Sequence, residues 1–353
     1  RHAAGLIDVT PLYKYEVKGP DAARALARIM VRDIRKLKLH QITYTCWCDD
    51  FGKVLDDGTV MRLGEEYYRV TAAAPTYEWL VRHCQGFNVT IEDVSRTVAA
   101  LAVQGPRSRD ILKKASDIDL DKLRFFRAAQ GKIDGIPVWI TRTGYTGDLG
   151  YEVWVSNENA VPLWEALMDA GKAFGLEPAG LDALDVCRVE AGFIMNGVDY
   201  YSANHCLIES RKSTPYETGL GWTVNLDRDP FIGQAALRAE KANGPARRFV
   251  GLEIDWDEVQ ALFARHGLPP EVCTSAWRSP VPVYTTSGLQ IGQATSGSWS
   301  PMLKKNLALA TLDAPHGKIG EEMNIEVTVE YVRHKVKATV RKKPFFDPAR
   351  KRE

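Results

Sequence analysis

Short apolar segments that alternate in period two, separated by turns rich in glycine and proline, recur along this 353-residue chain. Over residues 42–73 the alternation predicts antiparallel hairpins, and a second series of such segments runs over 250–340. Amphipathic helical patterns lie between them, as at 161–174. Hairpins and helices without a regular strand–helix–strand alternation predict an α+β fold rather than a doubly wound parallel sheet.

A charged stretch with glycine and proline, over 238–248, predicts a domain boundary. Beyond it, short β-type segments with regularly spaced turns indicate a small β-barrel or sandwich of about 100 residues.

Charge and hydropathy exclude several classes of protein. The chain has 46 Lys and Arg against 45 Asp and Glu, so its net charge of +1 provides no overall field for nucleic acid or an anionic membrane. No segment approaches the roughly 18 consecutive apolar residues of a membrane-spanning helix, and the first residues lack the three-part pattern of a signal peptide. We therefore expect a cytoplasmic protein with neither a nucleic-acid nor a membrane partner.

The six cysteines are too few and too scattered for a disulfide framework. The close pair Cys46 and Cys48 has no second cysteine pair to complete a tetrahedral site, and the seven histidines show no ligand spacing. Free cysteine is commonly buried, so we interpret the pair as strand thiols and expect no bound metal.

Familiar nucleotide and hydrolase motifs are absent. Residues 144–150 read G-x-x-G-x-x-G, which is the wrong spacing for a dinucleotide-binding loop, and no P-loop sequence occurs. The serine-centred nucleophile elbow is also missing. The sequence thus gives no support to hydride transfer, phosphoryl transfer or serine hydrolase chemistry.

Carboxylates in glycine-bounded turns are the remaining chemical signal. Asp56-Asp57-Gly58 can be a simple hairpin turn, or it can direct one carboxylate into a cavity where burial tunes it for proton or cation chemistry. Tyr145 and Glu152 lie in a glycine-rich hairpin that would bring a phenol and a carboxylate together. Taken singly, these features leave both interpretations open.

A series of motifs in a fixed order extends over nearly the whole chain. In chain order they are Gly5-Leu6-Ile7-Asp8-Val9, Gly19-Pro20-Asp21, Leu55-Asp56-Asp57, Val103-Gln104-Gly105-Pro106, Arg142-Thr143-Gly144-Tyr145-Thr146-Gly147, Gly150-Tyr151-Glu152, Gly180-Leu181-Asp182-Ala183, Arg188-Val189-Glu190-Ala191-Gly192, Glu217-Thr218-Gly219-Leu220-Gly221-Trp222, Phe231-Ile232-Gly233 and Thr295-Ser296-Gly297-Ser298-Trp299-Ser300-Pro301. This succession resembles the aminomethyltransferase family, typified by the T-protein of the glycine cleavage system.

The resemblance implies an architecture. Members of the family have three subdomains arranged as a clover leaf around bound tetrahydrofolate. By this resemblance, residues 1–238 form the folate-binding module of two α+β subdomains, the inserted one spanning roughly 15–110. Residues 247–346 then form the C-terminal β-barrel, and 347–353 a basic tail.

The resemblance also implies site residues. Asp56 takes the place of the catalytic aspartate, while Tyr145 and Glu152 match the pocket tyrosine and the glutamate that holds the pterin ring. A carboxylate suits the donor edge of a pterin, and an aromatic ring can pack on its face. The other expected cofactor-binding residues are Arg188, Trp222 and Tyr67. An internal ion pair for Arg188, and core positions for the aromatic residues, remain open alternatives.

Three departures from the glycine cleavage pattern affect the substrate. Thr10-Pro11-Leu12 replaces a Ser-His-Met sequence, Leu184 replaces an arginine, and an extra segment over 256–279 resembles insertions in folate-dependent demethylases. The chain also begins without Met, and by resemblance we expect preceding residues to contribute to the donor site.

We therefore predict an enzyme that moves a methyl group from a small methylated donor to tetrahydrofolate, the donor being an O-methyl aromatic, a sulfonium or an N-methyl compound. One alternative is the aminomethyltransferase of glycine cleavage, whose partner is a lipoyl carrier protein. Another, from a different class, is a non-enzymatic folate-binding factor for iron–sulfur assembly. Such factors carry a Lys-Gly-Cys-Tyr-x-Gly-Gln stretch, whereas this chain has Pro230-Phe231-Ile232-Gly233-Gln234.

Overall fold

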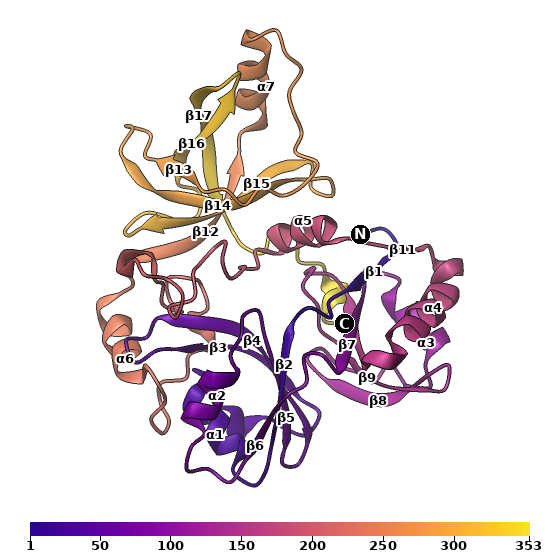
Figure 1. Cartoon of the computed structure of the whole chain (residues 1–353). Helices are drawn as coiled ribbons and strands as arrows, with labels where there is room; N and C mark the ends of the chain where they lie inside the picture. Colours follow the sequence, from indigo (N-terminus) through magenta and orange to yellow (C-terminus); the bar gives the residue numbers. More distant parts are fainter. The chain divides into compact units, whose positions relative to one another are not determined.

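The computed structural model describes residues 1–353, which form two compact units (Figure 1). The first unit comprises Arg1–Gly180, Thr223–Arg238 and Pro348–Glu353, and the second comprises Leu181–Trp222 and Ala239–Asp347. Each unit is described separately below.

The first unit contains a five-stranded antiparallel sheet. Its strands, in spatial order, are β3 (Ile42–Cys48), β4 (Val54–Gly64), β5 (Tyr67–Ala72), β2 (Tyr13–Lys18) and β6 (Thr90–Asp93). The helices α1 (Ala22–Ile29) and α2 (Tyr77–His83) accompany it. In α1 the buried residues Ala22, Ala25, Leu26 and Ile29 recur at helical spacing, so one face of the helix is apolar. The hairpins predicted over 42–73 are thereby confirmed.

A six-stranded sheet forms the rest of the core of this unit. Its spatial order is β11 (Leu176–Pro178), β1 (Ala4–Asp8), β7 (Val98–Gln104), β10 (Gly150–Ser156), β9 (Ile136–Thr141) and β8 (Ala128–Ile133). Only the β11–β1 pair is parallel. The helices α3 (Ser108–Ala115) and α4 (Ala160–Gly171) lie together beside this sheet (Figure 1), and Ile111 and Leu163 enter its hydrophobic core.

The two sheets of the first unit are joined by a shared hydrophobic cluster. Ile42 and Met61 from the five-stranded sheet pack with Ala128 and Trp154 from the six-stranded sheet. A backbone hydrogen bond of 3.0 Å from the amide of Ile42 to the carbonyl of Phe126 reinforces the junction. The junction fixes the end of β3 against the outer strands of the other sheet.

The second unit is built on a closed β-barrel. Its strands, in order around the barrel, are β12 (Arg247–Ile254), β15 (Lys305–Asp313), β14 (Gln290–Ser300), β13 (Val281–Tyr284), β16 (Glu322–Val329) and β17 (Val332–Arg341). Closure removes the free edges that an open sheet would expose. The predicted α+β fold with a C-terminal barrel is therefore confirmed.

Three further α-helices are present: α5 (Leu181–Ala191), α6 (Gln234–Asn243) and α7 (Trp256–Arg265). The helix α7 comes from the extra segment at 256–279. Asp255 caps it by accepting a hydrogen bond of 3.0 Å from the amide of Glu258, and its residues Val259 and Leu262 pack into the barrel core.

The two observed units are each made of segments that are separate in the chain, whereas the domains expected from the sequence are continuous ranges. Leu181–Trp222 groups with the barrel, because α5 packs on β14 and β15. The strand β7 belongs to the six-stranded sheet, so the five-stranded sheet of the inserted subdomain ends at Asp93. Within the expected basic tail, Ala349–Lys351 forms a 3₁₀ helix that belongs to the first unit, and Lys351 is buried.

All six cysteines are free thiols. No three His, Cys, Asp or Glu side chains converge as metal ligands would. None of the helices combines the length and the apolar character needed to cross a membrane.

Candidate active site

The register of β3 and β4 separates the two adjacent aspartates onto opposite faces. Asp57 lies opposite Cys46, and Tyr44 lies opposite Thr59, so Tyr44 and Asp57 are diagonal neighbours on one face. Asp56 lies opposite Trp47, which is 1% exposed in the core. Since side chains alternate along a strand, only one of the two carboxylates can face the half-exposed side.

Asp56 is a buried structural carboxylate. It is 1% exposed, and one oxygen accepts hydrogen bonds of 2.9 and 2.8 Å from the amides of Ala73 and Ala74. The other oxygen accepts a hydrogen bond of 2.9 Å from the amide of Asp57. These bonds fix the chain that follows β5 against β4.

Asp57 belongs to a cluster with two tyrosines. The hydroxyl of Tyr44 donates a hydrogen bond of 2.5 Å to the Asp57 carboxylate, and both residues are half-buried. Burial raises the pKa of Tyr44 well above its usual range, and the negative charge of Asp57 and the phenol of Tyr145 raise it further. Tyr44 is therefore a neutral donor at physiological pH. Tyr145, in the loop between β9 and β10, lies close enough to influence it.

Glu152 projects from β10 beside two threonines. The hydroxyl of Thr143 donates a hydrogen bond of 2.6 Å to the carboxylate of Glu152, and that of Thr141 lies 3.5 Å from the same oxygen. Burial raises the pKa of Glu152 even though both hydroxyls favour its charged form. The side chain is only half-buried, so a carboxylate with few protein donors is left for a ligand to meet.

The glycine-rich loop between β9 and β10 is fixed from beneath by Gln104. The side-chain NH₂ group of Gln104 donates hydrogen bonds to the carbonyls of Thr143 and Tyr151 at 3.2 and 3.1 Å. Its side-chain oxygen accepts a hydrogen bond of 2.9 Å from the hydroxyl of Thr146. A Cβ on Gly144 or Gly150 would lie 2.1 Å from that oxygen, so both positions require glycine. The loop is largely buried, except that Gly144 is exposed and Tyr145 is half-buried.

Tyr67 is not brought to this cluster. Its hydroxyl donates to the carboxylate of Glu16, and its ring packs in the cluster that joins the two sheets. Burial and the proximity of Glu16 raise its pKa to about 12, although the charge of Arg69 opposes the shift. These contacts correspond to the structural alternative that the sequence left open for Tyr67.

Arg188 and Trp222 belong to the second unit. The guanidinium of Arg188 is fully buried and donates to Asp185 at 2.5 Å, to Asp199 at 2.6 Å and to the hydroxyl of Ser296 at 3.1 Å. This is the internal ion-pair network that the sequence left open, and it links α5 to β14. Trp222 is 62% exposed.

The second unit also contains a lysine in an unfavourable environment. The Nζ of Lys343 lies 3.7 Å from the ring centroid of Phe249, and burial lowers its pKa from 10.5 to about 7, although Asp199 partly opposes the shift. Between these two values the folded protein releases this proton while the unfolded chain retains it. The contribution of Lys343 to stability therefore rises as the pH increases from about 7 to about 10.

Lys343→Met is expected to raise the Tm at pH 6, by an amount corresponding to on the order of 2 kcal/mol, because it removes a charge held in a poorly hydrated place. The gain should shrink by pH 9, where the wild-type lysine is already neutral. Thermal unfolding at both pH values measures this, with Lys342→Met at the exposed neighbouring position as control. An equal gain at pH 6 and pH 9 would contradict the assigned cause.

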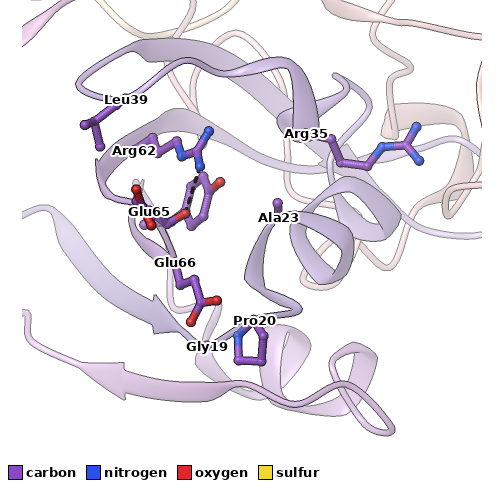
Figure 2. Close-up of a pocket in the computed structure, with 9 residues that line it drawn as sticks. Gly19, Pro20, Ala23, Arg35, Leu39, Arg62, Glu65 and Glu66 are labelled. Atoms are coloured by element: carbon purple, nitrogen blue, oxygen red, sulfur yellow. Dashed lines mark hydrogen bonds between the residues drawn. The ribbon is translucent and has the colours of Figure 1, made fainter.

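A recess of about 440 Å³ lies elsewhere in the first unit, between the start of α1 and the β4–β5 turn (Figure 2). Its two arginines are engaged by the protein: Arg35 pairs with Asp33 at 2.9 Å, and Arg62 donates to the carbonyl of Leu37 at 2.8 Å. The recess contains none of the site residues above.

The geometry adds residues that the sequence did not single out for the site. Tyr44, Thr141 and Thr143 contact the candidate carboxylates, and Asp57 rather than Asp56 shares a face with Tyr44. The alternation along β4 could have indicated Asp57. Trp47 is buried and lies opposite Asp56, so Asp56 faces the core and Asp57 faces the other side.

The chain matches two family models: the GCVT N-terminal domain over residues 1–228 and the glycine cleavage T-protein C-terminal barrel domain over residues 247–347. It is 36% identical to the aminomethyltransferase of Caldanaerobacter subterraneus subsp. tengcongensis, covering 98% of this chain and 86% of that protein. It is also 36% identical to an aminomethyltransferase of Bacillus cereus, with 98% and 87% covered. The crystal structure of the glycine cleavage system aminomethyltransferase T from Bartonella henselae is similar, with a TM-score of 0.82 at 26% identity over 98% of this chain and 87% of that one.

Proposed function

Because the chain belongs to the glycine cleavage T-protein family of aminomethyltransferases, we propose that it transfers an aminomethyl-derived one-carbon unit to tetrahydrofolate. The observation that carries the proposal is a set of four half-buried polar side chains in one unit. Tyr44 and Asp57 are joined by a hydrogen bond, Tyr145 acts electrostatically on Tyr44, and Glu152 is contacted by two threonines.

The residues around Glu152 fit a pterin. A pterin presents an edge of N–H donors, and Glu152 presents a carboxylate that two threonines orient. Desolvation has raised its pKa, so donors from a ligand would replace the water that the carboxylate has lost. Tyr145, in the same glycine-rich loop as Thr143, would provide an aromatic face for the ring.

We assign the reactive carboxylate to Asp57 in place of Asp56. Bound tetrahydrofolate would supply the nitrogen that accepts the one-carbon group. Asp57 would stabilise the positive charge that develops as that transfer proceeds, and Tyr44, a neutral donor, would orient the carboxylate. Asp56 holds the adjacent backbone and so places Asp57.

For the donor we propose an aminomethyl group borne by a lipoyl carrier protein. Its carbon would form two bonds to nitrogens of tetrahydrofolate as its bonds to the lipoyl sulfur and to the amine break, which releases the carrier thiol and ammonia. The relatives that cover 98% of the chain are named aminomethyltransferase, which favours this donor over a small methylated compound. The extra segment that suggested a demethylase forms α7, whose apolar residues serve the barrel core.

The test incubates the purified protein with tetrahydrofolate and one of four donors: aminomethyl-lipoyl carrier, N-methylated glycines, O-methyl aromatics or methylated sulfonium compounds. We expect 5,10-methylene-tetrahydrofolate with the lipoyl carrier alone. Formation of 5-methyl-tetrahydrofolate from a methylated donor would overturn the donor assignment, and binding of folate without product from any donor would favour a binding-only protein.

Glu152→Gln is expected to have opposite effects on folate affinity and on stability. The dissociation constant for tetrahydrofolate should rise by roughly 10- to 100-fold, because hydrogen bonds to a charged acceptor are replaced by weaker ones. The Tm without folate should rise slightly, because the raised pKa of Glu152 means that its charge destabilises the folded state at neutral pH. Titration calorimetry and thermal unfolding measure the two, and unchanged affinity would remove Glu152 from the pterin site.

A further inference from the structure

The residues 348–353 pack within the first unit, against the loop that carries Tyr145. The guanidinium of Arg350 pairs with the carboxylate of Asp148 through two hydrogen bonds, 2.7 Å from Nε and 2.9 Å from Nη2. The Asp148 side chain is 1% exposed, and Arg1 lies 3.6 Å from it. Burial alone would raise the pKa of Asp148. The hydrogen bond and charge of Arg350, the amide of Leu149 and the charge of Arg1 together hold that pKa below its usual range.

The start of the same loop is held by the same segment. Arg142 is 3% exposed, and its Nη2 donates to the backbone carbonyls of Arg350 at 3.4 Å, Lys351 at 3.2 Å and Glu353. Its Nη1 donates to the carbonyl of Leu123 at 3.2 Å. The loop over 142–148 is therefore tied at both ends to residues that follow it by about two hundred positions in the chain.

Between these ties the loop has little freedom. Gln104 fixes it from beneath, so the remaining movement of Tyr145 is governed by the two ends. If Arg350 were absent, the buried charge of Asp148 would retain only Arg1 and its own backbone bond to Leu149. A buried carboxylate without its strongest partner moves toward water, and Asp148 would take the loop with it.

We propose that Arg350 is a positioning residue for folate: through Asp148 it sets the placement of Tyr145 and, through Thr143, of Glu152. This inference rests on the proposed function, because it assumes that Tyr145 and Glu152 meet tetrahydrofolate. The side chain of Arg350 contacts the carboxylate of Asp148. Its effect is transmitted by the loop, whose pose must be accurate because small misplacements at an active site cost much of the rate.

The test compares Arg350→Met, Arg350→Lys and Asp148→Asn with wild type in the full chain. We expect Arg350→Met to raise the dissociation constant for tetrahydrofolate on the order of tenfold, with faster backbone amide exchange over 143–150. Arg350→Lys should recover part of the affinity, because it restores one charge contact but not the two-bond geometry. Arg24→Met, which removes an Arg–Asp pair of 2.8 Å on α1, is the matched control and should leave affinity unchanged.

The readouts separate the two proposals. If wild type binds tetrahydrofolate but Arg350→Met and Asp148→Asn bind it equally well, the positioning role is wrong. An equal loss in Arg24→Met would also overturn it, since the effect would then be general destabilisation. If Arg350→Met fails to fold, the tetrahydrofolate affinity of Arg350→Lys is compared with that of wild type, and equal affinities would show that the positioning role is wrong. If wild type itself does not bind tetrahydrofolate, the proposed function fails, whatever the exchange data show.

Discussion

Replacing Asp57 by asparagine is expected to reduce kcat by about 10²- to 10³-fold, since a group that stabilises developing charge is typically worth that much. Asparagine keeps the shape of the side chain and an oxygen that can accept the hydrogen bond from Tyr44. It removes only the negative charge. Because the side chain is half-buried and lies at the edge of the cluster, the Tm should change by no more than a few degrees.

Asp56→Asn is the matched comparison, and its expected effect is the reverse. Its carboxylate accepts three backbone amide bonds, and an asparagine would turn an NH₂ group toward one of those donors. The loss of stability should be about 1–3 kcal/mol, as for buried groups left unsatisfied. Steady-state kinetics and thermal unfolding of both variants measure this. Full activity in Asp57→Asn, or a greater loss of kcat in Asp56→Asn at equal folded fraction, would return the catalytic role to Asp56.

Replacing Arg188 by methionine is expected to destabilise the second unit by about 3–5 kcal/mol, because removal of one partner leaves buried charges uncompensated. Its partners Asp185 and Asp199 have side chains that are 3% and 0% exposed. Denaturant unfolding followed by the fluorescence of the barrel tryptophans gives the free energy of unfolding directly.

The control for this prediction is Arg278→Met. Arg278 pairs with the same Asp185 at 2.7 Å, but its side chain is 47% exposed. An exposed partner contributes about 0–1 kcal/mol, so this variant should unfold close to wild type. If both variants lose the same stability, the buried network around Arg188 does not have the importance assigned to it.

Patterns of local spacing predicted most of the fold. The hairpins over 42–73, the helix at 161–174 and the barrel strands follow from alternation and turns, since each depends on residues near one another in the chain. The grouping of Leu181–Trp222 with the barrel could not be obtained in this way. It depends on contacts such as that of Arg188 with Ser296, which are more than one hundred positions apart.

The site was predicted only in part, because local spacing identifies some of its residues and the others depend on how the strands pair. Glycine spacing drew attention to Tyr145 and Glu152, but the choice between Asp56 and Asp57 required knowledge of which face of β4 is buried. A one-residue error in that choice exchanges the buried carboxylate of Asp56 for the half-buried carboxylate of Asp57. Tyr44 has no motif of its own, and its role follows only from strand register.

The contact between Asp148 and Arg350 also has a consequence during synthesis. A ribosome that adds about 5–20 residues per second completes the intervening 202 positions in roughly 10–40 s. Once β11 has been synthesised, the six-stranded sheet can be assembled while the loop bearing Tyr145 still lacks its partner. Nascent chains, and products terminated before Arg350, would therefore hold folate poorly, because Asp148 has no such partner until Arg350 has been synthesised.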